Sequence, residues 1–174
     1  MKPVATNMAE RDLPIWNGAG AVRYDQDYAA WLDAQIGFLR ERKFSQLDLD
    51  NLLDEVASLR RWNWELFRDA VKMVIRQMLT WDVREDERCR DWAQRIELDR
   101  SAMLQELKGS TSFADRREDA IAEAYELARF EMSQGDKLPF RLFPEQCPYS
   151  WQDIATREHP LTRDPQPAFT PYKS

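Results

Sequence analysis

Apolar residues recur at helical spacing along most of the chain. They predict a first helix over residues 25–43, which Asp25 can cap, and a second over residues 49–81, which Asp48 can cap. The second helix would be about 50 Å long at ~1.5 Å per residue. We expect one apolar stripe of this helix to face the interior of a helical bundle. The stripe has heptad spacing and consists of Leu52, Val56, Leu59, Leu66, Ala70 and Val74.

Two further helices are predicted after a charged turn. The run at 82–87 has no apolar periodicity, and the helix that follows it should end at Gly109. Thr111 or Ser112 can cap a fourth helix, which Gly135 should end. Apolar residues again return at helical spacing, at Trp92, Ile96, Met103, Leu104 and Leu107 in the third helix and at Ile121, Ala124, Tyr125, Ala128 and Met132 in the fourth.

These patterns divide the chain into three segments. Residues 1–22 lack periodicity and should form a loose leader, whereas residues 23–137 should form a single domain that resembles a four-helix bundle. Residues 138–174 are rich in proline and should partly wrap the bundle, with one short helix that Ser150 can cap. The predicted fold class is therefore all-α, with a long second helix and a Pro-rich C-terminal extension.

Composition supports a folded helical protein. Apolar residues make up 43% of the 174 residues and charged residues 32%, while only five glycines occur, which excludes overall disorder and disfavours a turn-rich β fold. The net charge of -6 disfavours a protein that binds nucleic acid. No apolar run reaches the ~18 residues of a membrane span. Cys89 and Cys147 are far apart in sequence and predict reduced thiols, so we expect a cytoplasmic protein with no membrane segment.

The sequence carries no signature of catalytic chemistry. A carboxylate-bridged metal centre in a bundle needs two Glu-x-x-His pairs, but His159 is the only histidine and lies in the Pro-rich segment, where we expect it to be exposed. The same shortage disfavours a serine or cysteine nucleophile activated by histidine, and no glycine-rich phosphate loop is present. We therefore expect no metal and no cofactor, and the sequence leans against an enzyme.

Two polar residues interrupt the apolar stripe of the second helix. Asn63 and Gln77 are two heptads apart, so both amides should point toward the bundle centre. One interpretation is that they fix helix register by hydrogen bonding to neighbouring groups. The other is a polar pocket for a small molecule or a hydrolytic reaction, which Glu55 would also line.

Basic residues follow another face of the same helix. Arg61, Arg68, Lys72 and Arg76 fall within one narrow stripe that could bind an anionic partner such as nucleic acid. Alternatively, this face is solvated or covered by acidic residues of another helix.

Tryptophan is unusually frequent, with seven residues. Trp31, Trp81 and Trp92 occur at apolar helical positions and should pack in the core. The apolar pattern does not assign Trp16, Trp62, Trp64 and Trp151 to the core. If any of these rings is exposed, it would indicate a surface that binds a partner.

Several segments between residues 24 and 150 resemble the family known as domain of unknown function 29. The most specific are LDLDNLLDE at 47–55 and FPEQCPY at 143–149. The resemblance implies an all-helical bacterial cytoplasmic protein with no established activity, and it supplies no catalytic residues. Gln77 and Thr80 depart from the family pattern. The matching positions have no known role and include Tyr28, Trp31, Asp48, Asn51, Glu55, Trp81, Trp92, Phe143, Pro144, Cys147 and Pro148.

Together these observations favour a non-enzymatic protein–protein interaction or regulatory module. The partner would be another protein or a second copy of the chain. The polar pocket and the anion-binding stripe remain as alternative hypotheses.

Overall fold

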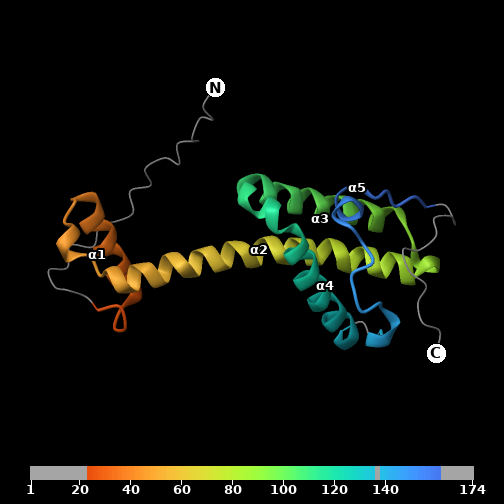
Figure 1. Ribbon diagram of the computed structural model, residues 1–174, viewed down its shortest axis with the longest axis horizontal. Helices are drawn as coiled ribbons and strands as arrows, with labels where there is room; N and C mark the ends of the chain where they lie inside the picture. The colour runs from red at the N-terminus through yellow and green to blue at the C-terminus, as the bar shows by residue number, and fades with distance from the viewer. Residues whose placement is uncertain (1–22, 136–137, 162–174) are drawn as a thin grey trace, which may run out of the picture. The chain divides into compact units, whose positions relative to one another are not determined.

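A computed structural model describes residues 23–135 and 138–161, and this part of the chain contains helices and no strand (Figure 1). The all-α class and the long second helix are confirmed. The α-helices are α1 (Tyr28–Arg40), α2 (Leu49–Val83), α3 (Arg90–Gly109), α4 (Arg117–Gln134) and α5 (Trp151–Thr156). Short 3-10 helices lie between them: η1 (Phe44–Gln46), η2 (Glu85–Glu87), η3 (Thr111–Arg116) and η4 (Phe140–Leu142).

The chain forms two compact units, with the boundary between Leu59 and Arg60 inside α2. In the first unit, α1 and η1 accompany the first turns of α2. The second unit contains the rest of α2 and all later helices. The segment boundaries expected from the sequence at residues 22 and 137 stay predictions, and the leader lies outside the described residues, as does Trp16.

Capping side chains account for the starts of α1, α2 and α5. The backbone N–H of Asn51 donates to Asp48 Oδ1 at 3.4 Å, so α2 begins where its sequence predicts. Ser150 likewise caps α5 and forms a reciprocal capping box with Asp153. The predicted cap of the first helix is wrong: Asp27, not Asp25, accepts from the Ala30 N–H at 3.0 Å.

The predicted start of the fourth helix is also wrong. Neither Thr111 nor Ser112 caps α4, because both belong to η3, which precedes α4. Phe113 explains this geometry, since its ring packs against Trp64 and Phe67 with centroids 5.4 Å apart in each pair. A tertiary contact therefore holds this turn in 3-10 form where the local sequence predicts a helix cap.

The core of the second unit lies where α2, α3 and α4 meet the segment that contains α5 (Figure 1). Small residues of α4, such as Ala124 and Ala128, are fully buried and allow the helices to approach closely. The α2 side chains of this core are Phe67, Val71, Val74, Ile75, Met78 and Leu79. Trp81 is also completely buried.

The predicted α2 stripe is covered only in part. Val74 is buried and Ala70 is partly buried, but Val56, Leu59 and Leu66 are exposed. The expectation of a stripe buried along its whole length is therefore wrong. Heptad spacing specifies a face of a helix, whereas burial depends on whether another element packs on that face.

The tryptophans differ in their surroundings. Trp31 and Trp81 are buried as predicted, and Trp92 is partly buried. Among those that the sequence left unplaced, Trp62 is exposed, while Trp64 and Trp151 are partly buried against the core of the second unit.

Candidate interaction surface

Asp48 is the centre of a hydrogen-bond network in the first unit. Its Oδ2 accepts from the Trp31 indole Nε1 at 3.1 Å and from Asn51 Nδ2 at 2.7 Å, and its backbone N–H donates to Gln35 Oε1 at 2.9 Å. The hydrogen bond from Asn51 is the main reason that the pKa of Asp48 is lowered. These contacts fasten α1 to the start of α2.

Glu55 lies about two turns further along α2 than Asp48 and adds to the same contacts. Its two carboxylate oxygens accept hydrogen bonds from the Tyr24 hydroxyl at 2.6 Å and the Tyr28 hydroxyl at 3.0 Å, which raises the pKa of both tyrosines. The rings of Tyr24, Tyr28 and Trp31 contact one another, with centroids 4.9 to 5.9 Å apart. The role of Glu55 seen here is therefore to join two helices.

The three residues of the predicted polar pocket differ in their surroundings. Asn63 is exposed, which corrects the expectation that it points into a bundle. Gln77 is partly buried, and its Oε1 accepts from the Trp92 indole Nε1 at 2.8 Å. Fourteen residues of helix place the two amides about 21 Å apart. The Gln77 contact matches the interpretation in which a buried amide bonds to a neighbouring side chain.

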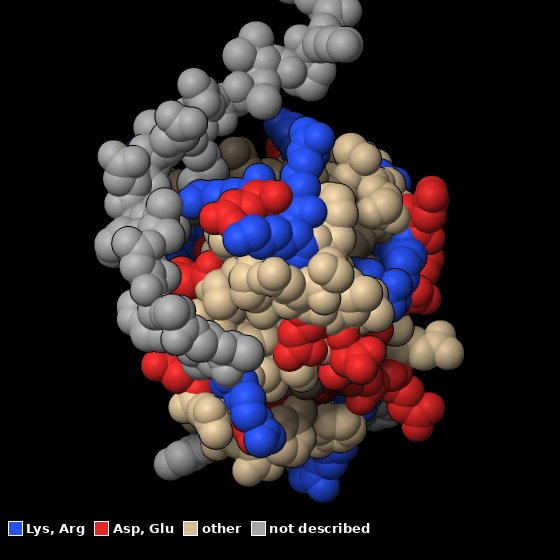
Figure 2. Space-filling view, turned by 90° about the vertical axis from the view of Figure 1, so that its left-hand side faces the viewer, with Lys and Arg blue, Asp and Glu red and all other residues tan. Residues whose placement is uncertain are grey.

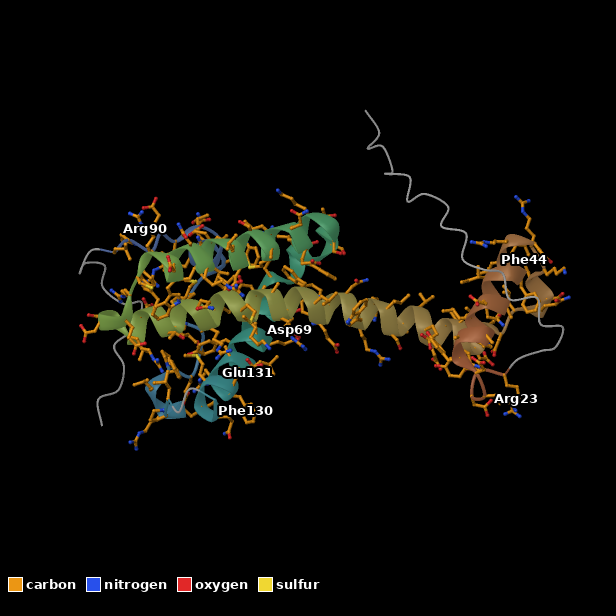
Figure 3. All side chains as sticks on the ribbon, turned by 180° about the vertical axis from the view of Figure 1, so that it is seen from behind. Arg23, Phe44, Asp69, Arg90, Phe130 and Glu131 are labelled. Atoms are coloured by element: carbon orange, nitrogen blue, oxygen red, sulfur yellow. The ribbon has the colours of Figure 1, made fainter. Side chains whose placement is uncertain are left out.

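Acidic residues lie beside much of the predicted basic stripe. Lys72 Nζ lies 2.7 Å from Glu131 Oε1 and 3.7 Å from Asp69 Oδ1, and these two acids lie together in Figure 3. Arg68 lies 3.2 Å from the same Asp69 oxygen and 4.0 Å from Glu123 Oε2. Two of the four cations thus pair with acids of α2 and α4.

The other two cations differ in exposure. Arg76 is partly buried and Arg61 is exposed. Each has an interaction with the rest of the protein. The four residues therefore do not form one uniformly open basic surface.

The FPEQCPY segment binds to α4 through its backbone. The Tyr125 hydroxyl donates to the Pro144 carbonyl at 2.7 Å, and Arg129 Nη1 donates to the Glu145 carbonyl at 3.3 Å. Phe143 is buried in the core. Burial raises the pKa of Cys147 to about 11, so its thiol stays protonated at neutral pH and is a poor nucleophile. This segment packs as part of the fold.

A buried ion pair links the end of α2 to the residue that follows α5. Arg157 donates from Nη2 to Asp82 Oδ1 at 2.6 Å and from Nη1 to Oδ2 at 2.9 Å. The Tyr149 hydroxyl donates to the same Oδ2 at 2.9 Å, and the Asp82 side chain has no exposed surface. Nothing in the sequence distinguished Asp82 from its charged neighbours, because its partners are distant in sequence.

His159 is buried, so the expectation that it is exposed is wrong. Its ring packs edge-on against Trp81 with centroids 5.4 Å apart. Burial, followed by the positive charges of Arg100 and Arg157, lowers its pKa to about 4. His159 is buried because Arg100 of α3 donates to the carbonyls of Ile154 and Arg157 and so holds the chain after α5 against α3.

The free energy of unfolding should therefore decrease as the pH falls below neutrality. Unfolded histidine has a pKa near 6.5 and folded His159 near 4, so the unfolded chain binds the proton first. We expect a loss of about 1–2 kcal/mol at pH 5, after allowing for screening by solvent. Urea denaturation at pH 7 and at pH 5 measures this loss in the free energy of unfolding. The His159→Phe variant keeps a ring beside Trp81 but has no imidazole to protonate, so its free energy of unfolding should fall less between pH 7 and pH 5. Equal losses in the variant and the wild type would contradict the assignment of this effect to His159.

Exposed apolar side chains follow one face of α2 in the first unit. Leu49, Leu53 and Val56 are 59%, 67% and 62% exposed, and Leu59 is 54% exposed. Their spacings of four, three and three residues align them along the helix. We call these four residues the α2 apolar face. Figure 2, viewed from the side on which Figure 1 draws α1, shows uncharged surface between groups of basic and acidic side chains.

A family model matches residues 23–159 and is described as Domain of unknown function DUF29. The chain belongs to the DUF29 family. The match begins at the first described residue and includes the FPEQCPY segment, Arg157 and His159. The description of the family assigns no activity.

No curated protein and no solved structure matches the chain. Within residues 23–135 and 138–161, no helix combines the length and the apolar character that a membrane span requires. The same part of the chain contains no cluster of three or more His, Cys, Asp or Glu residues that could hold a metal ion.

Proposed function

We propose that this member of the DUF29 family is a non-enzymatic protein–protein interaction or regulatory module of the bacterial cytoplasm, and that its partner binds the α2 apolar face. The observation that carries the proposal is a continuous row of exposed aliphatic side chains on a regular helix. Isolated exposed leucines are common, but an aligned row of four is typical of a surface that another element covers.

Burial of this face would supply useful binding energy. Each Leu or Val side chain that becomes fully buried contributes about 1.5–3 kcal/mol. Leu49, Leu53 and Val56 have the alternating four- and three-residue spacing by which a helix packs against another helix. The network around Asp48 and Glu55 supports this proposal, because it holds the start of α2 in place before any partner binds.

The alternative of a small-molecule or hydrolytic site has less support. Each of its candidate residues has other surroundings: Glu55 bonds to two tyrosines, Asn63 is exposed and Gln77 bonds to Trp92. A reactive site requires its polar groups to face a common space.

Site-specific photocrosslinking in the cells that produce the protein tests the proposal. A photoreactive phenylalanine analogue would replace Leu53 or Val56, each in the full chain. We expect both positions to give the same discrete adduct with one protein, either a different protein or a second copy. Mass spectrometry identifies the adduct, and sedimentation analysis of the purified chain distinguishes self-association from binding of another protein.

Asp33 provides the matched control, because it is exposed on α1 of the same unit and lies outside the α2 apolar face. The adduct should be absent when the photoreactive residue replaces Asp33. It should also disappear when Leu49→Lys accompanies the probe at position 53. No discrete adduct from either α2 position, or equal yields from Asp33, would contradict the proposal.

A further inference from the structure

A cavity of about 440 Å³ lies in the second unit, beside the basic stripe that the sequence predicted. It is bounded by α2 on one side and η3 on the other. Its lining residues are Arg60, Arg61, Trp64, Ser112, Phe113 and Arg116. This volume suits a small organic ligand.

The charge of this cavity is opposite to that of the protein. Three guanidinium groups line it and no carboxylate does, whereas the whole chain carries a net charge of -6. Arg116 of the cavity donates to Asp119, and further along α2 Arg68 and Lys72 lie against acids of α4. A concave surface with one sign of charge concentrates ligands of the opposite sign.

The aromatic wall of the cavity is held from several sides. The Trp64 indole Nε1 donates to Glu123 Oε2 at 3.1 Å. The guanidinium carbon of Arg116 lies 3.8 Å from the centroid of the Trp64 ring, and its Nε donates to Asp119 Oδ2 at 3.3 Å. Phe113 stacks on Phe67, which is completely buried. A wall positioned in this way loses little conformational freedom when a ligand binds.

We propose that this cavity binds a small phosphate monoester with an aromatic ring, of the size of a mononucleotide. Arginine pairs with phosphoryl oxygens through two parallel hydrogen bonds, and Arg60 and Arg61 are both exposed at the cavity. Phe113 and Trp64 line the cavity and offer the ligand ring apolar contact. The cavity shares no residue with the α2 apolar face, because all of its residues belong to the second unit.

Isothermal titration calorimetry at low ionic strength tests this inference with three probes. Adenosine 5′-monophosphate carries both groups, adenosine carries only the ring and inorganic phosphate carries only the anion. We expect the monophosphate to bind roughly ten-fold more tightly than either fragment and to weaken as salt is added. The inference is overturned if the monophosphate gives no saturable heat, or if a fragment binds as tightly as the monophosphate.

The double variant Arg60→Gln/Arg61→Gln should weaken binding of the monophosphate by roughly ten-fold or more. Arg40→Gln/Arg141→Gln is the matched control, because it removes two charges from exposed positions outside the cavity and should bind normally. Equal affinity in the two double variants overturns the inference.

A second measurement needs no arginine variant. On the wild-type chain, the indole N–H resonance of Trp64, assigned with Trp64→Phe, should shift on titration with the monophosphate. No shift under saturating conditions would overturn the inference even if the double variant failed to fold.

Discussion

Replacement of Asp82 by alanine should lower the free energy of unfolding by about 3–5 kcal/mol. The variant leaves the Arg157 guanidinium without its two carboxylate hydrogen bonds and the Tyr149 hydroxyl without its acceptor. A buried charge that loses its partner is costly because the protein interior solvates it poorly. The effect should be large because the Asp82 side chain has no exposed surface.

Urea denaturation at pH 7, followed by circular dichroism, measures this loss. Asp86→Ala serves as the control, since Asp86 is exposed in η2 and should change stability by less than about 0.5 kcal/mol. Tyr149→Phe removes one hydrogen bond from the cluster and should cost about 1 kcal/mol. If Asp82→Ala and Asp86→Ala unfold at the same urea concentration, the buried ion pair does not have the assigned role.

Phe67→Ala should lower the free energy of unfolding by about 3–5 kcal/mol, whereas Leu53→Ala should change it by less than about 0.5 kcal/mol. Both residues are large, apolar and on α2. Phe67 is completely buried and contacts Trp64, Phe113 and Trp151, so its truncation leaves a cavity among aromatic rings. Leu53 is 67% exposed, so truncation removes little buried surface.

The same denaturation measurement compares the two variants with the wild type. Leu53→Ala should retain the wild-type midpoint in the purified chain at low concentration, where association contributes least. A destabilisation by Leu53→Ala as large as that by Phe67→Ala would mean that Leu53 is buried in the folded chain. Similar midpoints for wild type and Phe67→Ala would contradict the core described around Phe67.

Local sequence was a good guide to where helices begin and end. Asp48 and Ser150 cap α2 and α5 as predicted, because a cap depends on a side chain and backbone N–H groups two or three residues away. Gly109 and Gly135 lie at the ends of α3 and α4 as predicted, although neither has the positive φ with which glycine often ends a helix. The exceptions are the starts of α1 and α4. Asp27 rather than Asp25 caps α1, and at α4 Phe113 packs against the core.

The candidate sites were less accessible to prediction. The basic stripe was visible in the sequence, but its members have different surroundings. Lys72 pairs with Glu131 and Arg61 lines a cavity, and this difference depends on the positions of α4 and η3. Arg60 and Arg116 were not predicted at this cavity. Arg60 is next to Arg61 in the sequence, but the proximity of Arg116 to Arg61 joins chain segments more than 50 residues apart, and no periodicity along one helix encodes it.

The sequence by itself determined the helical class, the length of α2 and the heptad positions of its apolar side chains, because periodicity and capping act over a few residues. Only the tertiary structure decided which of those positions are covered: Phe67 is buried, whereas Leu53 is open to a partner. It also decided that Asp82 and His159 are buried. Burial depends on contacts between distant segments, and these depend on packing of the whole unit.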